Sequence, residues 1–126
     1  NCVNWVFGHI VATRQFVLDL AGARPWWDEE RHRTYSAGDD GAWSPERAMP
    51  LQALLVDYDR SQELLADALP RLTPDALAAP ALLGTVGETL AFLQFHEGYH
   101  AGQLGILRRL LGKPGVIRPP NVRRPG

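Results

Sequence analysis

The chain has 126 residues, which is enough for one domain and too few for a second. Its 13 Lys+Arg and 14 Asp+Glu leave a formal net charge of −1, which argues against a general polyanion-binding surface, so we expect no nucleic-acid partner. The single cysteine, Cys2, excludes an internal disulfide and a cysteine-based zinc finger. Because no apolar run reaches the ~18 residues that span a bilayer and no signal-peptide pattern is visible, we expect a cytoplasmic protein with no membrane partner.

The first predicted helix covers Val3 to Leu20, where apolar residues are too dense for a helix with a single buried side. Asn1 or Asn4 is its expected N-cap, and Gly22 is the expected exit. Residues 23–49 contain a proline, a tryptophan pair, a charged run and turn-prone glycines, so the pattern predicts a long loop. Loops of this length in a compact domain are usually functional or mobile.

Two further long helices are predicted downstream, and together the three make the expected fold class all-α. Residues 51–69 carry apolar side chains at three- and four-residue spacings between two prolines. The last helix begins at the capping-box motif Thr85-Val86-Gly87-Glu88 and runs to about residue 111. We therefore divide the chain into a helical bundle domain, 1–115, and a C-terminal tail rich in proline and arginine, 116–126.

Three of the four histidines are predicted to point into the core. His96 and His100 are four residues apart, so their rings lie on one face of the last helix, one turn apart. His9 lies on an apolar side of the first helix, whereas His32 falls in the charged run and is expected to be solvated. The apolar residues that share the face of His96, and that should face the core with it, are Phe92, Leu93, Leu107 and Leu110.

Three inward imidazoles on two helices can meet at one point, which is how helical bundles build metal sites. Such a site leaves coordination positions open, as catalytic metal sites do. Zinc, nickel, iron and manganese all accept imidazole ligands, so the residues do not select one ion. We expect a divalent metal ion bound by His9, His96 and His100.

The same segment also spells H-E-x-x-H, the zincin signature, in which Glu97 would be the general base. The metzincin continuation needs glycine and histidine where the chain has Gln103 and Ile106, and no acidic residue follows Glu97. Zincin-type peptidase chemistry is therefore not expected.

The last helix carries small residues on the side opposite His96, and each interior glycine costs ~1 kcal/mol relative to alanine. Close approach of another helix would offset this cost, either within the bundle or across a dimer interface. The small residues are Gly87, Ala91, Gly98, Gly102 and Gly105.

Two segments resemble the DinB/YfiT-like family of metalloenzymes. Asn4–Ile10 holds a lone histidine in a Trp-x-x-Gly-His context, and Gly84–Gly105 holds the paired histidines before Gly-Gln-Leu. The resemblance covers the chain from Asn1 to about Gly115. It implies a four-helix bundle, usually a homodimer, with a divalent ion held by three histidines. Because the family's lone histidine usually lies on the second helix, we expect that a first helix is missing from this chain.

The resemblance also implies an activity, because characterised relatives include S-transferases and isomerases that use bacillithiol or mycothiol. We expect a metal-dependent S-transferase that joins a low-molecular-weight thiol to electrophilic small molecules. Gln103, one turn beyond His100, is a candidate to orient a bound water or ligand. The alternatives are a metal-dependent hydrolase that uses a metal-bound hydroxide and a non-enzymatic metal-binding stress protein.

Overall fold

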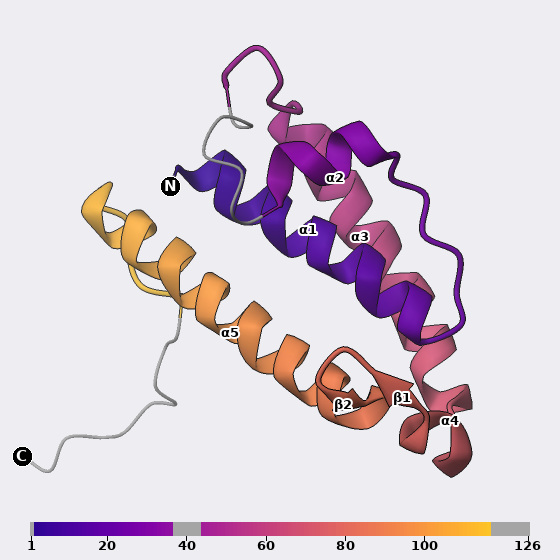
Figure 1. Cartoon of the computed structure of the whole chain (residues 1–126). Helices are drawn as coiled ribbons and strands as arrows, with labels where there is room; N and C mark the ends of the chain where they lie inside the picture. Colours follow the sequence, from indigo (N-terminus) through magenta and orange to yellow (C-terminus); the bar gives the residue numbers. More distant parts are fainter. Residues whose placement is uncertain (1, 37–43, 117–126) are drawn as a thin grey trace, which may run out of the picture.

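The computed structural model of the chain describes residues 2–36 and 44–116. The fold is all-α, as expected, and is dominated by three long helices (Figure 1). These are α1 (Val3–Leu20), α3 (Leu51–Ala68) and α5 (Val86–Leu110). The shorter elements are α2 (Glu29–Tyr35), the 3-10 helix η1 (Leu69–Arg71), α4 (Pro74–Ala78), and the antiparallel strands β1 (Pro80–Ala81) and β2 (Gly84–Thr85).

The N-cap of α1 differs from the expected asparagine. Its N-cap is Cys2, whose Sγ accepts a hydrogen bond from the backbone N–H of Trp5 at 3.5 Å. The expectation of an Asn4 cap was wrong, because the Asn4 side-chain amide donates to the carbonyl of Met49 at 2.9 Å instead. The exit at Gly22 is confirmed, since its φ of 74° is a left-handed conformation that glycine adopts without strain.

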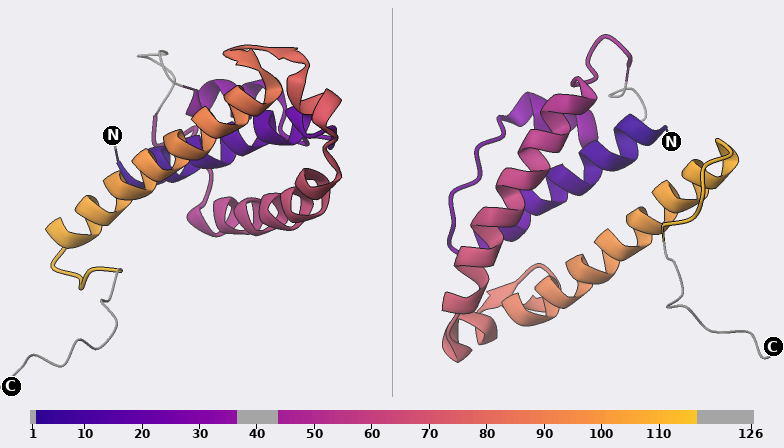
Figure 2. Two further views of the ribbon diagram at one scale, coloured as in Figure 1. Left: turned by 90° about the horizontal axis from the view of Figure 1, so that it is seen from below. Right: turned by 180° about the vertical axis from the view of Figure 1, so that it is seen from behind.

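α1 and α3 begin at the same end of the molecule and run alongside each other, whereas α5 runs in the opposite direction (Figures 1 and 2). The segment between α1 and α3 must therefore carry the chain back along the length of α1, about 27 Å. This requirement explains why the segment between Leu20 and Leu51 is so long; it is called the excursion below. The expectation of an unbroken loop at 23–49 was wrong, because Asp28 caps a short helix there by accepting from the N–H of Arg31 at 2.9 Å. The turn-prone glycines at 38–41 lie outside the described residues.

The excursion is fixed to α3 by a pair of tryptophans. The indole N–H groups of Trp26 and Trp27 donate to the two carboxylate oxygens of Asp57, at 3.2 and 2.7 Å. Both backbone N–H groups are directed at the side-chain carbonyl of Gln15 in α1, at 3.0 and 3.4 Å. These bonds close one end of the core cluster, which contains Val11, Ala12, Trp27, Tyr35 and Leu54.

α5 starts as predicted. The Thr85 hydroxyl accepts from the Glu88 N–H at 3.2 Å, and the Glu88 carboxylate accepts from the Thr85 N–H at 2.8 Å, which completes the capping box. Its burial differs from the expectation, because Phe92 is 47% exposed and Leu110 is 78% exposed. The reason is that α1 lies between α3 and α5, so α5 packs mainly on one neighbour (Figure 2).

The glycine face of α5 has no partner within the described part of the chain. A Cβ atom added at Gly98, Gly102 or Gly105 would meet nothing within 4 Å, so packing within the bundle is wrong for these three positions. Gly87 differs, since its added Cβ would lie 3.4 Å from the carbonyl oxygen of Leu77. Contact across a dimer interface stays a prediction. Among the described helices, none is long and apolar enough to cross a membrane.

Candidate metal centre

The three histidines predicted to meet do meet, where α1 crosses α5. The Nε2 atom of His96 lies 3.3 Å from Nε2 of His9 and 3.1 Å from Nε2 of His100. Ligand atoms bound to one ion at about 2.0–2.1 Å are separated by roughly 3 Å, so the spacing suits a shared metal. His9 and His100 are buried and His96 is half-buried. These three side chains could together hold a metal ion.

His9 is oriented by the excursion between α1 and α3. Its Nδ1 atom donates to the backbone carbonyl of Tyr35 at 2.6 Å, which leaves a lone pair on Nε2 in the neutral ring. The indole of Trp5 lies flat against the imidazole, with ring centroids 4.9 Å apart and an interplanar angle of 7°. One side of the site is therefore built from the last residue of α2.

Gly8 allows Tyr35 to reach this position. Tyr35 is fully buried, and its hydroxyl donates to Asn4 at 2.9 Å and accepts from the N–H of Met49 at 2.8 Å. A Cβ atom added at Gly8 would overlap the Tyr35 ring. The glycine that precedes His9 thus leaves room for the tyrosine whose carbonyl orients the histidine.

His100 is oriented within its own helix. Its Nδ1 atom donates to the Gln103 side-chain oxygen at 2.7 Å, and the Gln103 amide donates to the Tyr99 hydroxyl at 3.2 Å. In the neutral ring this leaves a lone pair on Nε2 of His100, which faces His96. His96 therefore faces two lone pairs, one from His9 and one from His100. Gln103, predicted as a residue that orients a bound water or ligand, contacts His100 in this structure.

The central histidine cannot satisfy both of its neighbours by itself. A single N–H on Nε2 of His96 could donate to only one of the two facing lone pairs, while its buried Nδ1 has no hydrogen-bond partner among the described residues. A cation among the three Nε2 atoms would engage all three lone pairs. The donor set therefore fits a metal ion.

The local electrostatics favour the neutral, ligating form of His9 and His96. Burial lowers the pKa of His9 below its usual value, against the opposing effect of the Tyr35 carbonyl, and the charge of a protonated His100 would lower it further. Burial also lowers the pKa of His96, and repulsion from His100 and His9 adds to this shift, while Glu97 opposes it.

Glu97, the would-be base of the zincin motif, is turned away from the three histidines and binds Arg14. The guanidinium donates to its two carboxylate oxygens at 2.9 and 2.6 Å. The same guanidinium also donates to the Tyr58 hydroxyl at 3.0 Å and to Ser61 at 3.2 Å. This network joins α1, α3 and α5, and a carboxylate held in this way is unsuited to act as a general base. No sequence pattern indicated this network, because Arg14 belongs to no recognisable motif.

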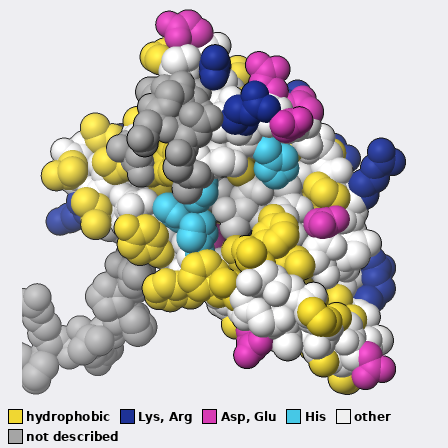
Figure 3. All heavy atoms as spheres, in the orientation of Figure 1, with side chains coloured by type: hydrophobic (Ala, Val, Ile, Leu, Met, Phe, Trp, Pro, Cys, Tyr) yellow, Lys and Arg dark blue, Asp and Glu magenta, His cyan; other side chains and the backbone are white. Residues whose placement is uncertain are grey.

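A cavity of about 270 Å³ opens beside His9 and His96. His32, expected to be solvated, is half-buried and lines this cavity from α2. Figure 3 shows histidine side chains at separate places on one face of the molecule, with hydrophobic side chains beside them. The other described lining residues are Ala12, Thr13, Phe16, Ser36, Leu82, Phe92 and Leu93.

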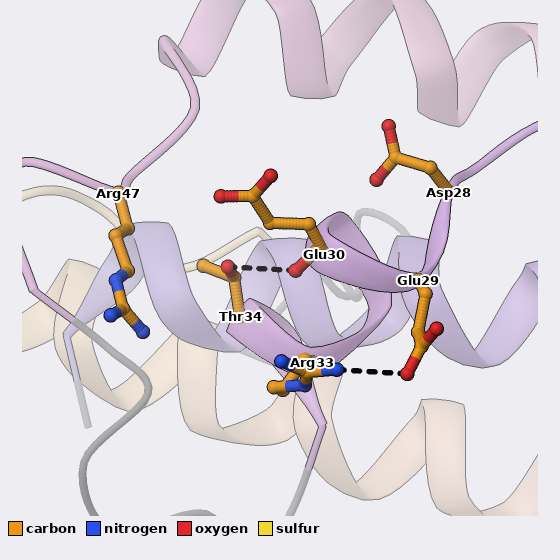
Figure 4. Close-up of a pocket in the computed structure, with 6 residues that line it drawn as sticks. All are labelled: Asp28, Glu29, Glu30, Arg33, Thr34 and Arg47. Atoms are coloured by element: carbon orange, nitrogen blue, oxygen red, sulfur yellow. Dashed lines mark hydrogen bonds and ion pairs between the residues drawn. The ribbon is translucent and has the colours of Figure 1, made fainter.

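A larger hollow of about 450 Å³ lies against α2 and contains none of the histidines (Figure 4). It is bordered by exposed charged side chains that come from α2 and from the segment before α3, such as Glu30 and Arg47. Arg33 pairs with Glu29 at 2.8 Å, and the buried Thr34 donates to the carbonyl of Glu30 at 3.0 Å. The histidines His9, His32 and His96 therefore line the smaller cavity and not the larger hollow.

Comparison with known proteins adds one finding. A family model described as the DinB superfamily matches residues 1–104. Neither the curated proteins nor the solved structures give a significant match. Because the family model covers well over half of the 126 residues, the chain belongs to the DinB superfamily.

Proposed function

We propose that the chain is a divalent-metal-dependent S-transferase that joins a low-molecular-weight thiol, of the bacillithiol or mycothiol type, to electrophilic small molecules. The metal ligands in this proposal are His9, His96 and His100. The observation that carries it is the convergence of three imidazole Nε2 atoms, with two of the rings, His9 and His96, in the lining of a mostly apolar cavity. Membership of the DinB superfamily supports the same assignment.

When bound, the ion lowers the pKa of a coordinated thiol and so supplies a thiolate at neutral pH. The reaction forms a carbon–sulfur bond and breaks the bond to the leaving group, which departs with the electron pair, while the thiol proton passes to solvent. The sulfur must come from a small molecule, because the only cysteine, Cys2, caps α1 with its Sγ. The chain's own part is to hold the three imidazoles and to keep the electrophile beside them, against the apolar side chains of the cavity.

Metal content separates the ligand set from the rest of the proposal. Purified protein is loaded separately with zinc, nickel, iron or manganese, dialysed and analysed for bound metal. We expect about one ion per chain for the wild type and little for His96→Ala. The matched control is His32→Ala, which removes a histidine that lines the cavity but does not contact the other three, and it should retain the ion. Equal metal content in the wild type and His96→Ala would refute the site.

Turnover is tested with monochlorobimane and bacillithiol. Metal-loaded wild type should form the fluorescent adduct faster than the uncatalysed reaction, and only when the thiol is present, whereas His96→Ala should not. Loss of chloride from the electrophile without thiol would indicate hydrolysis instead. Tight metal binding with no turnover under either condition would replace the transferase by a metal-binding protein without enzyme activity.

A further inference from the structure

The cavity beside the histidines is lined by residues from several elements. His9 and His96 lie in its lining together with mostly hydrophobic side chains, such as Phe16 from α1, Leu82 from the β1–β2 turn, and Phe92 from α5. Helix α2 and its C-cap add His32 and Ser36 to the same lining. A ligand in this cavity would therefore touch the proposed metal ligands, an apolar wall and a second, separate imidazole.

His32 is held in place by its backbone and by one ring contact. Its carbonyl accepts from the Ser36 hydroxyl at 2.6 Å, and its N–H donates to the carbonyl of Asp28 at 3.1 Å. The imidazole stands edge-on to the Trp27 ring, with centroids 6.0 Å apart. Within the described ranges the ring nitrogens make no hydrogen bond, so the N–H of the neutral ring is available to a ligand.

We propose that His32 is a substrate-binding residue whose ring N–H donates to an acceptor oxygen of the electrophile, and that this substrate is a small molecule with an apolar body. The proposal rests on the proposed function for its reaction but not for its binding step. A carbonyl or nitro group next to the electrophilic carbon is the acceptor that this lining fits, because it would lie beside His32 while the apolar body contacts Phe16, Leu82 and Phe92.

The size and lining of the cavity limit the substrate further. A volume of about 270 Å³ lies just below the ~300–1,000 Å³ typical of pockets for drug-sized ligands, so it suits a molecule built on a single ring or a short chain. The described lining contains no Asp, Glu, Lys or Arg. Because this lining offers a charged substrate no countercharge, it favours a neutral electrophile.

Binding can be measured without turnover by using unreactive aromatic ligands of matched shape. Acetophenone carries a carbonyl acceptor and ethylbenzene does not. Each is titrated into the full chain, with and without zinc, and followed by ¹H–¹⁵N NMR at the amides of Thr13 and Leu93, which line the cavity. We expect both ligands to shift these signals. His32→Ala should weaken acetophenone binding about 3- to 10-fold, the effect of one lost hydrogen bond, and leave ethylbenzene binding unchanged.

Two leucines of similar exposure provide the matched control for the apolar wall. Leu82 is 76% exposed and lines the cavity, whereas Leu110 is 78% exposed and lies outside it. Leu82→Asp should weaken both ligands, and Leu110→Asp should weaken neither. The absence of shifts at Thr13 and Leu93 in the wild type would overturn the pocket. Equal weakening of both ligands by His32→Ala would show that the ring only packs, and would overturn the hydrogen bond.

The two proposals fail separately in these experiments. If the ligands bind as described but no thiol adduct forms in the turnover assay, the pocket stands and the transferase assignment is wrong. If adduct formation occurs but the ligands do not bind beside Thr13 and Leu93, the transferase stands and the substrate pocket is elsewhere.

Discussion

At the scale of single residues, the position of His9 depends on the absence of a Cβ atom at Gly8. Gly8 has no side chain, so the Tyr35 ring can pack directly on α1 and bring its carbonyl within 2.6 Å of the His9 ring. Trp5 covers the other side of that ring. The Trp-x-x-Gly-His segment therefore specifies the surroundings of one imidazole: a stacking partner one turn earlier, and a gap for the residue that accepts its hydrogen bond.

Gly8→Ala tests this arrangement. The added methyl group displaces the buried Tyr35 ring, an overpacking cost of about 1–3 kcal/mol that opposes the ~1 kcal/mol gain in helix propensity. Moving the Tyr35 carbonyl should also lower metal affinity about 10- to 100-fold, as loss of a partner behind a metal ligand commonly does. Urea unfolding in EDTA and competition with a chelator measure the two effects. Gly98→Ala is the control, because open space there predicts higher stability and unchanged affinity.

A pH dependence follows from the buried imidazoles. Burial lowers the pKa of His9, His32 and His96 in the folded chain below the usual 6.5, so the unfolded chain binds protons more tightly. Their contribution is constant well above pH 6.5, and the free energy of unfolding should fall as pH drops below that value. Urea unfolding of metal-free protein between about pH 5.5 and about pH 8 measures the slope. If the slope is unchanged when His9, His32 and His96 are replaced by glutamine, these histidines are not its cause.

At the scale of elements, Arg14 ties the three long helices together. Its guanidinium binds Glu97 of α5 through two oxygens and also reaches Tyr58 and Ser61 of α3. The Arg14 side chain is 7% exposed and that of Glu97 is 28% exposed. The ion pair therefore lies largely out of water, beside His96, and it fixes how α5 is rotated relative to α1.

Removing the two partners in turn should have unequal effects. Glu97→Gln leaves a buried guanidinium without its countercharge and should cost about 2–4 kcal/mol, whereas Arg14→Met leaves a carboxylate that water still reaches and should cost about 1–3 kcal/mol. The double variant should cost less than the sum, because neither charge remains. Urea unfolding of the four proteins gives the coupling. Additive costs would mean that the pair does not link the helices.

Features that could be predicted from the sequence depend on residues close together in the chain, whereas those that could not depend on residues far apart in it. Helices α3 and α5 follow from local signals, namely proline boundaries and the Thr85 capping box, and the meeting of His9 with His96 and His100 follows from their helical faces. The bonds of Arg14 join residues 83 and 44 positions apart, and no local pattern marks them. Helix α2 was missed because its charged sequence has no apolar stripe, and with it the place of His32 in the cavity. The exposed Phe92 shows that a periodic apolar face does not say which neighbour covers it.

At the scale of the whole molecule, α5 carries an apolar face that the described chain leaves open. Phe95 is 69% exposed and Ile106 is 63% exposed, beside glycines whose added side chains would meet nothing. Exposed apolar patches of this kind commonly mark association surfaces. The predicted homodimer would place this face of α5 against a second copy.

Substitution at Gly102 tests the homodimer. We expect the wild type to have twice its chain mass of 14.0 kDa by light scattering after gel filtration, and Gly102→Leu to shift it toward the monomer because a large side chain prevents close approach. Gly102→Ala is the matched, smaller change. If the face is free in solution, Gly102→Ala should stabilise the chain by ~1 kcal/mol without a change in mass. A wild type of single-chain mass would contradict the prediction.

The hydrogen bond from His9 to the Tyr35 carbonyl has a consequence for the dynamics of the excursion. It makes the C-terminal end of α2 part of the support of the proposed metal ligands, so any opening of α2 that breaks this bond also disorders His9. A ligand that binds only the closed form stabilises it by mass action. Metal loading should therefore slow amide hydrogen exchange in α2, which lies 20 or more residues from the nearest ligand in sequence. The cell's free metal concentration would then set how often the substrate-facing wall with His32 is formed.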